Sequence, residues 1–163
     1  MFERIVTAIE TTVLGLWAGS MAGFAFIFAP IAIKSVPHMD TFASLIAATI
    51  RGVGSFGTIC GGIAIAASLA RVGGGGGRNL ALVRIGLVAV ALALSAYESQ
   101  TIIPRMEATA ARVPGPIDSV PKDDPRRVAY DAEHKASSSV YGTAFLCVVA
   151  ALSLAAFGRR AQA

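Results

Sequence analysis

Glu98, a carboxylate near the end of a long apolar segment, is the residue with the clearest potential for chemistry. Charged side chains inside membrane segments are rare and often functional. Glu98 could therefore bind a proton or a cation in a polar opening between helices. The alternative is a boundary carboxylate that faces water or pairs with Arg105 or Lys34.

A second group of polar side chains follows in the last third of the chain. Its members are separated by four, four and three residues, which places them on one helix face: Tyr130, His134, Ser138 and Tyr141. His134 could bind a proton, a metal or a haem, with His38 as the only second histidine. The alternative is a belt at the membrane interface, with hydrogen bonds between helices.

We expect these groups to share one side of the membrane with two basic residues, Lys34 after the first apolar segment and Arg51 before the second. The candidate polar cluster therefore consists of Glu98, His134, Ser138, Lys34, Arg51 and Tyr130. No Ser-His-Asp, Cys-His, paired-carboxylate or HExxH arrangement occurs. The sulfur-bearing residues Met21, Cys60 and Cys147 are most simply packing residues. We expect no catalytic residue, no metal site and no cofactor, and hence no enzyme.

Four apolar segments must position these groups. Hydrophobic residues make up 55% of the 163 residues and charged residues 15%, where soluble domains carry about a quarter charged. Crossing the roughly 30 Å hydrocarbon core takes about 20 helical residues. We expect spans at residues 11–33, 52–70, 80–103 and 138–157. The predicted fold is all-α, a single-domain bundle of four transmembrane helices.

Glycines recur every fourth residue in the first two spans. Gly15, Gly19 and Gly23 share one face of the first, and Gly57 and Gly61 repeat the spacing in the second. Small residues at this spacing let helix backbones approach closely. We expect the five glycines to pack helices, either within the bundle or against another subunit.

The connections are of different kinds. Residues 41–50 could lie in the interface or begin the second helix, and the glycines at 73–77 indicate a flexible linker. Residues 104–137 are expected to form a polar loop, with a short helix near 107–112 and an early start of the last helix near Arg126. Arg84, early in the third span, is expected to reach toward the interface.

Charge indicates how the chain sits in a membrane. Glu3 and Glu10 lie where a signal peptide would be positive, so we expect the first segment to be retained. Four spans place both termini on one side, and a purely basic linker and tail favour the cytoplasmic side of a bacterial inner membrane. The net charge of +4 is then explained by the bilayer. The expected partners are lipid and other membrane subunits or a second copy, and not nucleic acid.

Three motifs resemble a known family. Trp17-Ala18-Gly19 with Phe28-Ala29-Pro30, then Thr101-Ile102-Ile103-Pro104-Arg105-Met106, then the segment from Tyr130 to Ser138 occur in the order of a bacterial membrane domain of unknown function (DUF4149). That domain is similar to eukaryotic transmembrane protein 205. The chain departs from the pattern with Ile31-Ala32-Ile33 after Pro30 and with Glu133 before the histidine. The resemblance implies four membrane helices, no established catalytic activity, and a shared pattern that includes Pro30, Pro104, His134 and Ser137 or Ser138.

Three hypotheses of function remain open at this point. The leading one is a non-enzymatic packing subunit of a membrane complex, or a homo-oligomer, because the glycine faces exceed what one bundle needs. The second is a small transporter or channel for an ion or a small solute, because of the polar cluster. The third is a haem- or quinone-binding redox subunit that uses His134.

Overall fold

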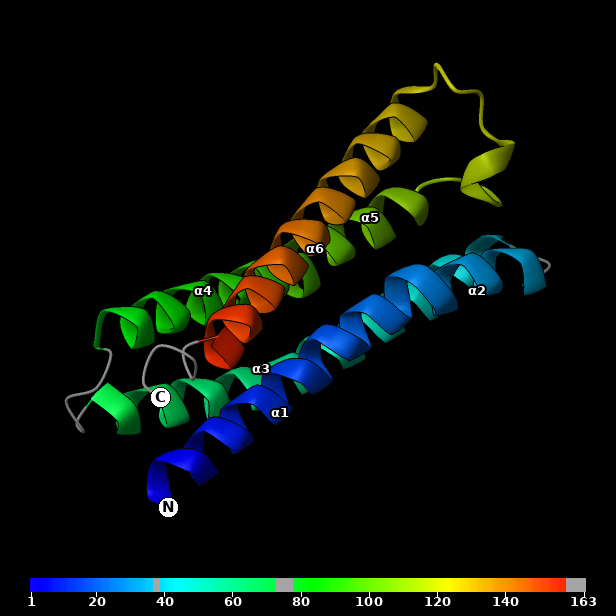
Figure 1. The fold of residues 1–163 in the computed structure, drawn as a ribbon. Helices are drawn as coiled ribbons and strands as arrows, with labels where there is room; N and C mark the ends of the chain where they lie inside the picture. Colours follow the sequence, from blue (N-terminus) through cyan, green and yellow to red (C-terminus); the bar gives the residue numbers. More distant parts are fainter. Residues whose placement is uncertain (37–38, 73–77, 158–163) are drawn as a thin grey trace.

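The protein is a bundle of four long helices (Figure 1). The structure is a computed structural model that describes residues 1–36, 39–72 and 78–157. The first long helix consists of α1 (Phe2–Gly23), η1 (Phe24–Phe28) and α2 (Ala29–Ser35), and the second is α3 (Met39–Val72). The third consists of α4 (Arg78–Tyr97), η2 (Glu98–Ile102) and α5 (Ile103–Ala110), and the fourth is α6 (Pro125–Phe157). Each contains a stretch apolar enough to cross a membrane, with mean hydropathy from 1.7 to 2.1. The predicted fold class is confirmed.

The helices form a closed ring. α1 packs against α3 and α6, and α4 packs against the same two helices. The chain begins and α6 ends at the same end of the bundle (Figure 1). We call this the terminal end, and the opposite end, where α5 leads through residues 111–124 into α6, the loop end.

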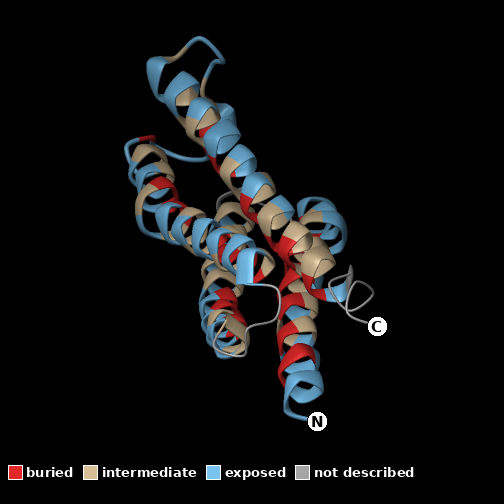
Figure 2. Cartoon of the chain, turned by 60° about the vertical axis from the view of Figure 1, so that its left-hand side comes forward, coloured by how far each residue is buried: buried red, intermediate tan, exposed pale blue. Residues whose placement is uncertain are grey.

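Small residues let the helices approach closely at the terminal end. α6 contributes Ala144, Val148, Ala151 and Ala155 to the core, opposite Leu14, Trp17 and Met21 of α1, Cys60 and Ala64 of α3, and Val88 and Ala91 of α4. The buried residues form narrow stripes on the inner faces (Figure 2). The outer faces carry exposed Leu16, Ile59, Leu82, Val90 and Leu146. Apolar outer faces with a small-residue interior are the pattern of helices packed in lipid.

The helices are longer than the predicted spans. Residues 41–50 belong to α3, and the third long helix continues past Pro104 to Ala110. α6 begins at Pro125, close to the predicted start at Arg126. The polar segment 104–137 is therefore helical at both ends, and only residues 111–124 connect them, with one short turn at Ile117–Ser119 (η3).

Side-chain contacts define the start of α6. Asp124 accepts a hydrogen bond from the backbone N–H of Arg126 at 2.8 Å, and Pro125 occupies the first helical position, where a proline is favoured. The Arg126 side chain and then its backbone N–H hold the pKa of Asp124 down at about 2. Arg127 pairs with Asp118 at 2.7 Å, which ties the connection to α6.

Two wide helical turns interrupt the first and third long helices. η1 and η2 are each five residues of π-helix, and in each case a proline follows as the second residue of the next helix, Pro30 in α2 and Pro104 in α5. A proline has no N–H, and its ring clashes with the carbonyl four residues earlier. A wider turn relieves that clash. Such turns are frequent at functional sites, and both of these border the same cavity.

Candidate functional site

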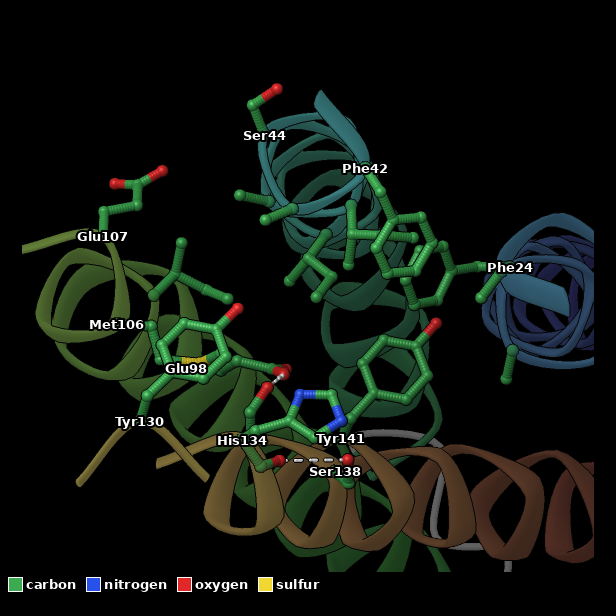
Figure 3. Close-up of a pocket in the computed structure, with 18 of the residues that line it drawn as sticks. Phe24, Phe42, Ser44, Glu98, Met106, Glu107, Tyr130, His134, Ser138 and Tyr141 are labelled. Carbon is green, nitrogen blue, oxygen red and sulfur yellow. Dashed lines mark hydrogen bonds between the residues drawn. The ribbon is translucent and has the colours of Figure 1, made fainter. Parts of the chain in front are cut away.

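A cavity of about 720 Å³ lies at the loop end of the bundle (Figure 3). Its walls come from the two wide turns with the adjoining ends of α1, α2 and α5, from the first halves of α3 and α6, and from the start of the connection after α5. Most of the lining is apolar, and includes Phe24, Phe42, Ile46, Ile50, Ile103 and Met106. Small-molecule sites are typically concave, largely apolar and about 300–1,000 Å³. The cavity has the size and the lining of such a site.

Glu98 provides the carboxylate of the cavity wall. It is the first residue of η2, and only 2% of it is exposed. The Ser137 hydroxyl of α6 donates a hydrogen bond to Glu98 Oε1 at 2.7 Å (Figure 3). Among the described residues no cationic side chain pairs with Glu98. Within the described part of the chain, the carboxylate is therefore buried with one hydrogen bond and no counter-ion.

Tyr141 joins α6 to the first wide turn. Its hydroxyl donates a hydrogen bond to the backbone carbonyl of Met21 at 3.0 Å, and its ring lies 5.3 Å from the ring of Phe24. Met21 comes just before η1, so a backbone carbonyl next to the wide turn receives a side-chain donor. This contact helps to hold the aromatic wall of the cavity in place.

Four of the six residues in the candidate polar cluster meet at the cavity: Glu98, Tyr130, His134 and Ser138 (Figure 3). Lys34 is exposed on α2 and does not line it. Arg51 pairs instead with Glu107 at 2.6 Å. It also lines a separate polar groove of about 290 Å³ between α3 and the end of α4 with η2, together with Gly54, Ser55, Thr58, Ser95, Ala96, Ser99 and Gln100.

The five predicted packing glycines fall into two groups. A Cβ built on Gly57 would lie 2.6 Å from Cε2 of Trp17, and one on Gly61 would lie 2.9 Å from Cδ2 of Leu92. These two glycines of α3 are thus in contact with α1 and α4. Gly15, Gly19 and Gly23 differ, because a Cβ built there meets no atom of the described residues within 4 Å.

A buried ionic cluster at the terminal end was missed by the sequence analysis. Glu10 is fully buried, and its carboxylate binds Arg84 at 2.9 Å and Arg71 at 3.0 Å and accepts a hydrogen bond from Ser68. The expectation that Arg84 reaches toward the interface is wrong, since its side chain is 1% exposed. The ion pair with Glu10 holds it inside the bundle instead.

The signal for this cluster was present in the sequence. Glu10 lies about two helical turns from the start of α1, and Arg84 lies slightly under two turns from the start of α4. Both helices begin at the terminal end. Opposite charges at similar depth in two apolar segments predict a pair, because an unpaired charge in the membrane is costly.

A comparison with protein families gives a match over residues 12–113, to the family described as Domain of unknown function (DUF4149). The chain belongs to this family. The matched range contains both proline-terminated wide turns and Glu98, and it ends before His134. No curated protein and no solved structure matches the chain.

The side chains of the cavity wall decide which cofactors it could bind. His134 and Glu98 are there, while His38 lies outside the described residues. Within the described part of the chain, no three His, Cys, Asp or Glu side chains gather as metal ligands would. Cys60 and Cys147 are free thiols. What the cavity offers chemically is an apolar enclosure with one buried carboxylate and several hydroxyl groups.

Proposed function

We propose that this integral membrane protein is a small-solute transporter, and not an enzyme, and that it takes an amphiphilic molecule into the cavity at the loop end. The observation that carries the proposal is a cavity of about 720 Å³ whose apolar wall contains Glu98, a buried carboxylate that pairs with no cationic side chain among the described residues. A bundle built only for stability would close such a space, because unfilled volume in a core lowers stability. It would also pair the carboxylate, as this chain does with Glu10.

The lining supports entry of a solute from outside. Phe26, Ser44 and His134 are exposed and also belong to the cavity wall. The cavity therefore opens onto the surface of the bundle. A solute could place its apolar body against Phe24, Phe42 and their neighbours, with a polar group toward Glu98.

Filling the cavity tests this function. Gly142 of α6 lines the cavity, and a Cβ built there meets no atom within 4 Å. In Gly142→Leu the new side chain should occupy the space and lower binding of the neutral probe N-phenyl-1-naphthylamine at least roughly tenfold, equivalent to about 1.4 kcal/mol. Equilibrium dialysis with protein in lipid nanodiscs, corrected for empty nanodiscs, measures this.

Gly86→Leu is the matched control. Gly86 has the same open surroundings on α4 but does not line the cavity, so this variant should bind as the unmodified chain does. Equal binding by both leucine variants would contradict the proposal. Release of probe from preloaded proteoliposomes then separates transport from static binding, and Gly142→Leu should abolish the protein-dependent release.

A second candidate function is the packing subunit or homo-oligomer. It is supported by the open face of Gly15, Gly19 and Gly23, and by the polar groove between α3 and α4. Small residues and Ser, Thr or Gln side chains are those by which membrane helices of separate chains associate. Gly19→Leu should then reduce the mass of the complex in mild detergent. An unchanged monomeric mass before and after the substitution would contradict it.

We also propose that the protein is located in a bacterial inner membrane with both termini on the cytoplasmic side. We further propose that the chain is related to transmembrane protein 205. The orientation is supported by basic residues at the terminal end, such as exposed Arg4 and Arg78. The relationship is supported by the motifs around Trp17, Pro104 and His134. A fluorescent reporter protein fused to the C-terminus should fold and fluoresce if that end is cytoplasmic.

A further inference from the structure

We propose that the solute taken up by the cavity is an apolar organic cation, held through its charge by Glu98. This inference rests on the proposed function and names the class of its substrate. The juxtaposition that carries it is the buried carboxylate of Glu98 in an aromatic cavity, where the described residues provide neither a cationic partner for it nor a lysine or arginine in the wall.

The charges around the cavity favour a cation. Its lining contains two carboxylates, Glu98 and Glu107, and neither lysine nor arginine among the described residues. Glu107 is half-exposed and already paired with Arg51, which lies outside the lining. Glu98 is left as the carboxylate of the described lining that has no cationic partner. An ionised carboxylate in apolar surroundings is costly, and a cation at hydrogen-bond distance removes that cost.

The chain itself shows how it treats a carboxylate with a structural role. Glu10 is as buried as Glu98, but two arginines and a serine surround it. Glu98 accepts one hydrogen bond, from Ser137, although an ionised carboxylate has about four acceptor positions. Acceptor capacity therefore remains for a ligand.

The aromatic rings of the cavity wall would also attract a positive charge. Phe24, Phe42, Tyr130 and Tyr141 belong to the same cavity as Glu98 (Figure 3). The face of an aromatic ring attracts a cation, and aromatic cages bind quaternary ammonium groups in this way. A small metal ion is a poorer fit, because Ca²⁺ or Mg²⁺ requires about six or more oxygen ligands. The remaining apolar wall suits a hydrophobic body attached to the charge.

Three bulky phenyl-bearing probes test the inference: tetraphenylphosphonium, which is positive, tetraphenylborate, which is negative, and triphenylmethanol, which is neutral and has one phenyl ring fewer. Their binding is measured by equilibrium dialysis against the full chain in nanodiscs of zwitterionic lipid at pH 8, corrected for empty nanodiscs and compared at equal probe concentration in the membrane. We expect the cation to bind at least roughly tenfold more tightly than the neutral probe, and the anion to bind least. Equal affinity for cation and neutral probe, or tighter binding of the anion, would overturn the inference while leaving the proposed function standing.

Substitution of Glu98 locates the preference. Glu98→Gln keeps an oxygen that can accept the Ser137 hydrogen bond but removes the charge, and should bring the cation and neutral probes to within a few-fold of each other. Glu3→Gln, which neutralises an exposed carboxylate of α1 that does not line the cavity, should leave the preference intact. A cation preference that survives Glu98→Gln overturns the assignment. Binding of the neutral probe by Glu98→Gln shows that the cavity is folded, and if no probe binds the unmodified chain, the proposed function fails together with the inference.

Discussion

Glu10 is held between two arginines in the interior of the bundle, so its charge matters for stability. Glu10→Gln would leave Arg84 buried without its partner. Removing one member of a buried pair typically costs about 3–5 kcal/mol. We therefore expect the free energy of unfolding, measured by titration from mild detergent into dodecyl sulfate, to fall by about 3 kcal/mol.

The same measurement on Glu107→Gln provides the comparison. Its ion pair with Arg51 is 42–48% exposed at the side chains, and exposed pairs contribute about 0–1 kcal/mol. If both substitutions had equally small effects, the ionic cluster at the terminal end would not stabilise the bundle.

The stability of the bundle also depends on the contact between Trp17 and Gly57. The indole of Trp17 lies where any side chain on Gly57 would project, and its Nε1 has no hydrogen-bond partner among the described residues. We expect Gly57→Ala to be about 1–3 kcal/mol less stable than Gly62→Ala, because overpacking forces side chains and backbone apart. Gly62 lies on the same helix with open space around it, so the gain in helix propensity is common to both variants. Equal stability of the two would contradict this packing.

At the scale of elements, the wide turn η2 sets the direction of Glu98. Pro104 prevents the regular hydrogen bond at this place, and Pro104→Ala removes that obstacle. A return to a regular α-helix would rotate Glu98 relative to α5 by a fraction of a turn. The contact with Ser137 and the packing of α5 on α6 could not then both persist.

We expect Pro104→Ala to weaken cation binding roughly tenfold while helicity measured by circular dichroism stays the same or rises. Pro125→Ala is the control, because its proline is at the first turn of α6, away from the cavity. Unchanged binding in Pro104→Ala would mean that the wide turn does not position the carboxylate.

The sequence predicts the four helices well and the details of two of them poorly. Length and apolarity identify each span, but the extension of α3 back to Met39 depends on tertiary packing, such as Ala47 and Ile50 against Ile103. Pro30 and Pro104 are visible in the sequence, yet whether a proline produces a kink, a stop or a wide turn is decided by neighbouring helices. Glu98 could be found as a carboxylate in an apolar segment, and the face from Tyr130 to Tyr141 from its spacing. That Lys34 does not line the cavity could not be found in this way, because it depends on how the helices pack.

At the scale of the molecule, the bundle divides into a packed end and a hollow end. The core of alanines and the cluster around Glu10 lie toward the terminal end, and the cavity lies toward the loop end. We expect tetraphenylphosphonium to slow amide hydrogen exchange in η1, η2 and residues 130–145, and to leave the segments around Glu10 and Arg84 unchanged. Protection spread evenly over both ends would contradict a site confined to the cavity.

Phe26 is 72% exposed on an apolar span and is also part of the cavity wall, so the cavity meets the lipid-facing surface. A solute that enters there comes from the bilayer, where an apolar cation is far more concentrated than in water. The affinity observed in buffer is then the product of a membrane partition coefficient and the affinity for the cavity itself. Each methylene added to the solute would raise the partition by about 0.8 kcal/mol without any new contact with the protein, so selectivity among homologues has to be compared at equal concentration in the membrane.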